Sequence, residues 1–211
     1  QEALVNSRFH LFREKLGSTG ALNGALDGFI AQLERDFRSE QYLEQLADLE
    51  RTCERSLATA RFGEGAAAVG PALAEVFRRL TAEAPSLFAP GAKRKSDFFR
   101  DIAGSQYLAT GEAVAKEAAT RYDYLLNVFD RSIIEVENRV YSDSIRRHLL
   151  AALERTFAAM PETESRRSQV EAPIKGILDT ELEETYVVGT GYGRARLPFS
   201  KEHIRSEIQC H

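Results

Sequence analysis

The feature that most constrains this chain is a helical spacing of apolar residues, which continues from the first residues to about Gly176. In segment after segment, hydrophobic side chains recur every three or four residues rather than at every second residue. A helix gathers residues with this spacing on one face, whereas a half-buried strand needs strict alternation. The sequence therefore predicts a mainly α fold, with a helical bundle over residues 1–180.

Glycine and polar residues divide the first third of the chain into helices. A first amphipathic helix ends at residues 17–20, Gly-Ser-Thr-Gly, because glycine favours a helix stop. A second helix begins near Ala21, and its polar side is left mainly for water: Gln32, Glu34, Arg35 and Asp36. The pattern restarts at Ser39 and continues to about Ala60. Cys53 lies among leucines there and is predicted to be a small buried apolar side chain rather than a reactive thiol.

Proline and glycine also indicate where later helices end. Pro85, Pro90 and Gly91 enclose an apolar loop after a helix predicted at residues 66–84, and this is the clearest internal boundary. A short helix near Phe98 ends at Gly104. The helical spacing then predicts three more helices, at residues 110–129, 144–160 and 170–178.

The charge and the hydropathy of the chain exclude several classes of partner. A net charge of -4 over 211 residues gives no general attraction to nucleic acid or to anionic lipid. No apolar run reaches the roughly 18 residues that a membrane span needs, and the amino end lacks the basic stretch and apolar core of a secretory signal. We expect a cytoplasmic protein that binds neither nucleic acid nor membranes.

Cysteine and histidine spacing predicts no metal site and no catalytic residue. Cys53 and Cys210 are far apart, and the chain has no Cys-x-x-Cys and no Cys/His spacing that would make a metal site. His10, His148 and His203 lie in helical segments without a positioned acidic, serine or cysteine partner, so each is read as an ordinary surface or partly buried histidine. The chain begins without Met and stops directly after an amphipathic segment, from which we expect it to be part of a longer polypeptide.

The pattern changes only near the carboxyl end. Residues 184–188 form a short β-type run, and a glycine loop follows with Arg194 beside it and a helical spacing from Ser200. The loop consists of Gly189, Thr190, Gly191, Tyr192 and Gly193. Its backbone amides could face a phosphate, but the loop is neither a Walker loop nor a dinucleotide fingerprint. From the pattern alone, a structural turn and an anion-binding loop both stay open.

The segment from Tyr186 to His211 resembles the ATPase family that includes benzoyl-CoA reductase ATPase subunits and 2-hydroxyacyl-CoA dehydratase activators. The matching pieces are Gly191-Tyr192-Gly193-Arg194 and Glu207-Ile208-Gln209-Cys210-His211, in the same order and at a similar separation. The resemblance implies that residues 181–211 are a strand-loop-helix piece of an actin/Hsp70-like (RNase H-like) ATPase core. Residues 1–180 then look like the helical insertion domain of the benzoyl-CoA reductase type of subunit.

The resemblance also implies cofactors and partners for the intact subunit. These are ATP with Mg, a 4Fe-4S cluster, the other subunits of the reductase, and ferredoxin as an indirect electron donor. The implied cofactor-binding residues are Gly189, Thr190, Gly191, Tyr192, Gly193 and Arg194. The family's phosphate loop has no counterpart here, since residues 17–20 follow a helix and lack its aspartate. The second glycine motif and the cluster cysteines belong downstream of His211, so residues 1–211 alone are expected to bind ATP weakly or not at all.

The leading hypothesis is a fragment of the ATP-hydrolysing subunit of an ATP-dependent benzoyl-CoA reductase. Such an enzyme couples ATP hydrolysis to low-potential electron transfer to an aromatic acyl-CoA. Two alternatives stay open: a stand-alone helical interaction or scaffold protein whose glycine loop is a plain turn, and an activator of a 2-hydroxyacyl-CoA dehydratase.

Overall fold

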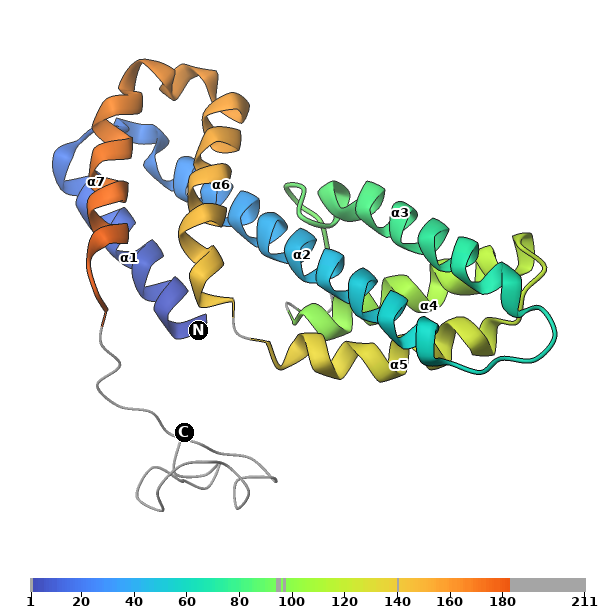
Figure 1. Cartoon of the computed structure of the whole chain (residues 1–211). Helices are drawn as coiled ribbons and strands as arrows, with labels where there is room; N and C mark the ends of the chain where they lie inside the picture. Colours follow the sequence, from blue (N-terminus) through green and yellow to red (C-terminus); the bar gives the residue numbers. More distant parts are fainter. Residues whose placement is uncertain (1, 94–95, 97, 140, 183–211) are drawn as a thin grey trace, which may run out of the picture.

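The computed structural model describes residues 2–93, 96, 98–139 and 141–182, and all regular structure in these residues is helical (Figure 1). The prediction of a mainly α fold is confirmed for this part of the chain. The predicted strand at residues 184–188, the glycine loop and the helix from Ser200 lie outside the described residues. The α-helices are α1 (Glu2–Thr19), α2 (Leu26–Thr59), α3 (Val69–Leu87), α4 (Phe99–Glu117), α5 (Tyr122–Glu137), α6 (Ile145–Ala159) and α7 (Arg167–Asp179).

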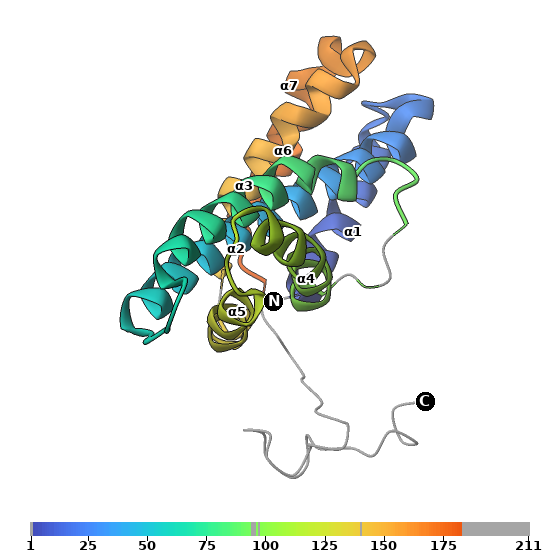
Figure 2. The ribbon, with the colours of Figure 1, turned by 90° about the vertical axis from the view of Figure 1, so that its right-hand side faces the viewer.

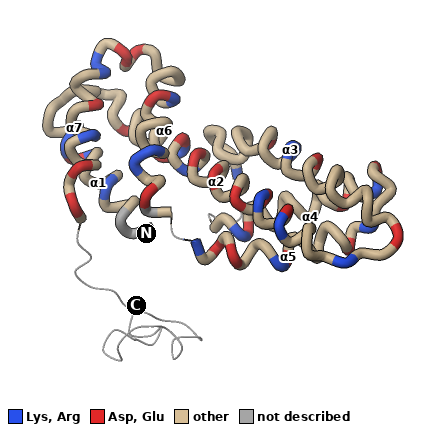
Figure 3. Tube along the Cα trace, in the orientation of Figure 1, with Lys and Arg blue, Asp and Glu red and all other residues tan. Residues whose placement is uncertain are grey.

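Helix α2 is the spine of the molecule. Its 34 residues extend for about 51 Å at 1.5 Å per residue. Helices α1, α6 and α7 lie along its first half and form what we call the first lobe, whereas α3, α4 and α5 lie along its second half and form the second lobe (Figures 1 and 2). Figure 3 shows acidic and basic positions interspersed over both lobes.

Each lobe has its own hydrophobic core. The first core includes an aromatic cluster in which the ring of Phe9 lies 5.6 Å from the rings of both Phe12 and Phe37. In the second core, the ring of Tyr107 stacks on Phe129 at 4.3 Å, and its hydroxyl donates to the carbonyl oxygen of Leu125 at 3.0 Å. The buried polar end of Tyr107 is thus satisfied inside an otherwise apolar core.

Cys53 lies in the second core, and its side chain is fully buried, as the sequence predicted. Burial raises the pKa of the Cys53 thiol to about 12, because a thiolate is poorly solvated among apolar side chains. Cys53 is therefore a packing residue and not a nucleophile.

The predicted boundaries at Ser39 and Gly104 were wrong, and so was the single helix predicted at residues 110–129. The restart at Ser39 does not exist, because α2 continues through Ser39, whose residue surface is only 5% exposed. Gly104 lies inside α4 rather than ending a helix, and a side chain there would meet the ring of Phe129. The real break follows Glu117, where Ala119 has a φ of 50° and the Thr120 amide bonds back to the Ala115 carbonyl at 3.0 Å, which is a Schellman-type stop.

The break at residues 85–97 does not separate the lobes. Helix α3 passes through Pro85 and ends at Leu87, and Phe88 packs in the same core as α3 and α4. The first helix reaches Thr19, and Gly20 follows with a φ of 63°, a conformation that glycine adopts without strain. The predicted glycine stop is therefore confirmed at Gly20 rather than at Gly17.

Truncating one fully buried leucine in either core should destabilise the fold. We expect Leu33→Ala in the first lobe and Leu125→Ala in the second each to lower the free energy of unfolding by about 2–5 kcal/mol, because each leaves a cavity. Urea unfolding followed by circular dichroism measures this change. Leu108→Ala, at a side chain 44% exposed, is the control and should cost less than about 1 kcal/mol. Equal effects at all three positions would contradict the two-core description.

Candidate functional site at the waist

The two lobes meet at a waist in the middle of α2. Phe37 is the last residue of α2 in the first core, and Tyr42 is the first in the second core. The turn between them belongs to neither core. We call the waist the stretch from Arg38 to Asp48, together with the side chains that contact it from α6 and from the segment between α5 and α6.

A row of polar residues crosses the waist at four-residue spacing on α2. The row consists of Asp36, Glu40, Glu44, Asp48, Thr52 and Ser56. Each step of four residues turns the row by about 40° around the helix axis. The row therefore faces α6 at its beginning and α5 at its end.

Every member of this row has a partner on another element. Near α6, Asp36 accepts a hydrogen bond from Thr156 at 2.8 Å, and Glu40 pairs with Arg155 at 2.7 Å. At the other end, Ser56 lies 3.0 Å from the hydroxyl of Ser132 on α5. The sequence prediction that Asp36 faces mainly water was wrong, because its acceptor role appears only when α6 packs against α2.

Glu44 is the centre of the α6 side of the waist. It accepts a hydrogen bond from Ser144 at 2.9 Å and pairs with Arg147. Its second oxygen lies 2.9 Å from Nε2 of His148, an ion-pair distance without the alignment of a hydrogen bond. His148 is 1% exposed, so it is not the ordinary histidine without a partner that the sequence indicated.

The imidazole of His148 is shifted towards its neutral form. Burial lowers the pKa of His148, because a charged ring is poorly solvated there. Glu44 and Glu40 from α2 act in the opposite direction, and Arg147 acts with burial. The nearby aromatic ring is that of Phe37, 6.3 Å away, and carries no charge. The pKa of His148 therefore lies below its ordinary value.

Asp48 is the centre of the α5 side of the waist. It accepts a hydrogen bond from the Tyr141 hydroxyl at 2.9 Å, lies 3.2 Å from Arg139, and pairs with Arg51. Burial raises the pKa of Asp48, but the hydrogen bonds from Tyr141 and Arg139 and the positive charge of Arg51 outweigh burial. Asp48 therefore has a pKa below its ordinary value and stays ionised at the junction of the lobes.

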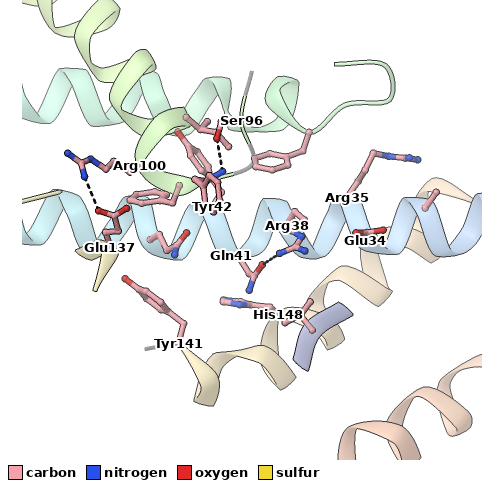
Figure 4. Close-up of a pocket in the computed structure, with 17 residues that line it drawn as sticks. Glu34, Arg35, Arg38, Gln41, Tyr42, Ser96, Arg100, Glu137, Tyr141 and His148 are labelled. Atoms are coloured by element: carbon pink, nitrogen blue, oxygen red, sulfur yellow. Dashed lines mark hydrogen bonds and ion pairs between the residues drawn. The ribbon is translucent and has the colours of Figure 1, made fainter. Parts of the chain in front are cut away.

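A groove of about 910 Å³ opens beside this network, and we call it the waist groove (Figure 4). Its floor is one face of α2 from Ala31 to Gln45, about 21 Å long. Side chains of both lobes line it, and the residues used below are Val5, Arg35, Arg38, Tyr42, Phe98, Phe99, Arg100, Glu137, Tyr141 and His148. In Figure 4 His148 and Tyr141 reach towards α2 from the side opposite Arg100.

The structure does not describe the residues that the sequence predicts to bind a cofactor. Gly189, Thr190, Gly191, Tyr192, Gly193 and Arg194 all lie outside the described residues, so their role stays a prediction. Where the chain is described, no cluster of three or more His, Cys, Asp or Glu side chains could hold a metal ion. None of the helices in the same part of the chain is long and apolar enough to cross a membrane.

One pattern in the sequence indicates that α2 has a polar packing surface at the waist. Acidic residues recur every four positions from Asp36 to Asp48, inside a helix whose other faces carry two hydrophobic stripes. Carboxylates in such a row are expected to find partners, since an unpaired buried charge is costly. The identity of the partners could not be inferred, because Thr156, Arg155, His148 and Arg139 come from distant parts of the chain.

His148 should make the stability of the fold depend on pH. Because its folded pKa lies below the ordinary 6.5, protons bind the unfolded chain more tightly, and the stability that neutral His148 contributes is lost as the pH falls below 6.5. We expect His148→Gln to flatten the fall in the free energy of unfolding between about pH 7 and pH 5. Urea unfolding at a series of pH values measures the slope. His10→Gln, at a side chain 69% exposed, is the matched control, and equal slopes in His148→Gln and wild type would refute the assignment.

Comparison of the chain with models of known protein families, with curated proteins and with solved structures gave no match. No membership of a family follows from these comparisons.

Proposed function

We propose that this chain is part of the ATP-hydrolysing subunit of an ATP-dependent benzoyl-CoA reductase. In this proposal residues 1–180 are a helical insertion domain, and residues 181–211 belong to an actin-like nucleotide-binding core. The resemblance of the segment from Tyr186 to His211 supplies the activity: ATP hydrolysis coupled to low-potential electron transfer to an aromatic acyl-CoA. ATP with Mg and a 4Fe-4S cluster would be bound by the intact subunit.

The observation that carries the insertion-domain part is the adjacency of the beginning of α1 and the end of α7. Arg8 in α1 donates hydrogen bonds to the carbonyl oxygens of Ile177 at 2.6 Å and Thr180 at 3.3 Å. Val5 and Ile174 share the first core, so the two helices are also joined by apolar packing. A domain inserted into a host must leave it and return to it at neighbouring points. The geometry of α1 and α7 meets this requirement.

The shape of the helical body supports a role in transmitting motion. The adjacent ends of α1 and α7, where the host domain would be attached, belong to the first lobe, and α2 carries the second lobe away from them (Figures 1 and 2). A change of shape on ATP binding can move such a body against neighbouring subunits. The second lobe is accordingly the part that we assign to contact with the other subunits of the reductase, which receive electrons indirectly from ferredoxin.

The nucleotide-proximal elements in this proposal are the loop at residues 189–193 and Arg194. We expect Arg194→Gln in the complete natural polypeptide to weaken ATP binding by about 10-fold to 100-fold, because a hydrogen bond between charged groups contributes roughly 1.5–3 kcal/mol. Isothermal titration calorimetry with ATP and Mg measures the affinity. Arg131→Gln, at an exposed position on α5, is the matched control and should bind ATP like the wild type.

Two outcomes would contradict the proposal. One is a complete polypeptide that does not bind ATP, which would favour a helical interaction or scaffold protein with a plain turn at residues 189–193. The other is appreciable ATP affinity in residues 1–211 alone, which would mean that the phosphate-binding elements have been misplaced.

Replacing residues 5–178 by a short Gly-Ser linker in the complete polypeptide should preserve ATP binding and abolish ATP-driven reduction of the acyl-CoA.

A further inference from the structure

We propose that the waist groove is a binding site for a small organic anion with a flat apolar body, and that this ligand contacts both lobes at once. The groove is lined by described residues of the helical body, whereas residues 189–194 lie outside the described residues. The proposal therefore stands or falls independently of the proposed ATPase function.

Unpaired polar atoms gather at this groove. Across the described residues, the buried side-chain nitrogen and oxygen atoms that have no hydrogen-bond partner belong to Arg35, Tyr42, Glu44 and His148. Arg35, Tyr42 and His148 line the groove, and Glu44 lies against His148. Tyr42 is 3% exposed and His148 1% exposed, so bulk water does not readily hydrogen-bond to their polar atoms. Folded proteins contain few such atoms, and their concentration beside one cavity indicates a polar ligand.

The chemistry of these atoms favours an anion. Nε of Arg35 can only donate a hydrogen bond, and the hydroxyl of Tyr42 and one nitrogen of neutral His148 can donate as well. Three guanidinium groups, those of Arg35, Arg38 and Arg100, and two carboxylates, those of Glu34 and Glu137, line the groove. The cationic side chains therefore outnumber the anionic ones by one. Arg38 already donates to Gln41 and Asn6. Arg100 is already near a carboxylate, because its Nη1 lies 3.4 Å from Glu137. Donors and positive charge match a carboxylate, phosphate or sulfonate group.

The rim of the groove favours a flat apolar body attached to that anion. Phe98 is 76% exposed at the groove, an unusual position for a large aromatic side chain. Phe99 lies beside it and contacts Tyr42, with 5.7 Å between the ring centroids. A planar group placed against Phe98 would cover its apolar surface and add a ring contact. The volume of about 910 Å³ falls in the range of small-molecule sites, which favours such a ligand over a folded partner.

A ligand in the groove would contact side chains of both lobes. Val5 and His148 belong to elements of the first lobe, whereas Phe99 and Arg100 belong to α4 in the second. The two hydrophobic cores share no buried residue, and α2 contributes to both. A bound ligand would therefore favour one relative placement of the lobes, to the extent that it binds that placement more tightly.

The test uses naphthalene-2-sulfonate as the anionic probe and naphthalene-2-carboxamide as its neutral counterpart. We expect the sulfonate to bind the purified chain in a single-site titration followed by NMR chemical shifts, and the carboxamide to bind at least about 5-fold more weakly. Arg35→Gln and Tyr42→Phe should each weaken sulfonate binding by about 5-fold to 10-fold, because each removes one donor. Arg131→Gln, outside the groove, should leave the affinity unchanged.

Two results would overturn the proposal: equal affinity for the neutral and anionic probes, or wild-type sulfonate affinity in both Arg35→Gln and Tyr42→Phe. Tyr42→Phe removes a single oxygen atom and preserves the ring contacts with Phe88 and Phe99, so its fold should be retained. Circular dichroism of each variant checks this. Failure of the probe to bind the correctly folded wild type would also refute the site, while the ATP affinity of the complete polypeptide would be untouched.

Discussion

The continuity of α2 through the waist is the constraint on which the rest of the structure depends. A helix of about 51 Å is longer than a single small core, since about 30 Å corresponds to the diameter of a small domain. The helix therefore has to bury one apolar stripe at each end, and its buried face turns from one partner set to the other near Ser39. A break at Ser39 would have produced two ordinary bundles. An unbroken helix instead produces two lobes on one spine.

The polar row on α2 fixes how α5 and α6 pack at the junction between the lobes. Carboxylates on a packed helix face are stable only with partners. Helix α6 and the segment between α5 and α6 supply arginine, serine, threonine, tyrosine and histidine side chains at the required positions. Hydrogen bonds and ion pairs are directional, so these contacts fix the register of α5 and α6 on α2 more strictly than apolar packing alone would. Among the partners of the row, His148 is the one whose two ring nitrogens both lack a hydrogen bond, and its buried ring borders both the row and the groove.

Both proposed functions would involve the relative placement of the two lobes. The first lobe holds the adjacent ends of α1 and α7, where a host domain would be attached, and the waist groove lies between this lobe and the second. A nucleotide-driven movement of the host and a ligand in the groove would both act on the angle between the lobes. Thermodynamic linkage then requires the coupling to be reciprocal: a ligand that favours one angle also changes the affinity for the nucleotide that favours it.

The sequence by itself determined that the described chain is helical, that Cys53 is buried, and roughly where most helices lie, because apolar periodicity and glycine stops are local properties of the backbone. It misplaced the boundaries at Ser39 and Gly104, where packing overrides a local signal. Only the tertiary structure decided that Glu44 meets His148, that Asp48 meets Tyr141, and that a groove opens between two separate cores. Those contacts join residues far apart in the chain, and no spacing within one helix encodes which distant side chain will face it.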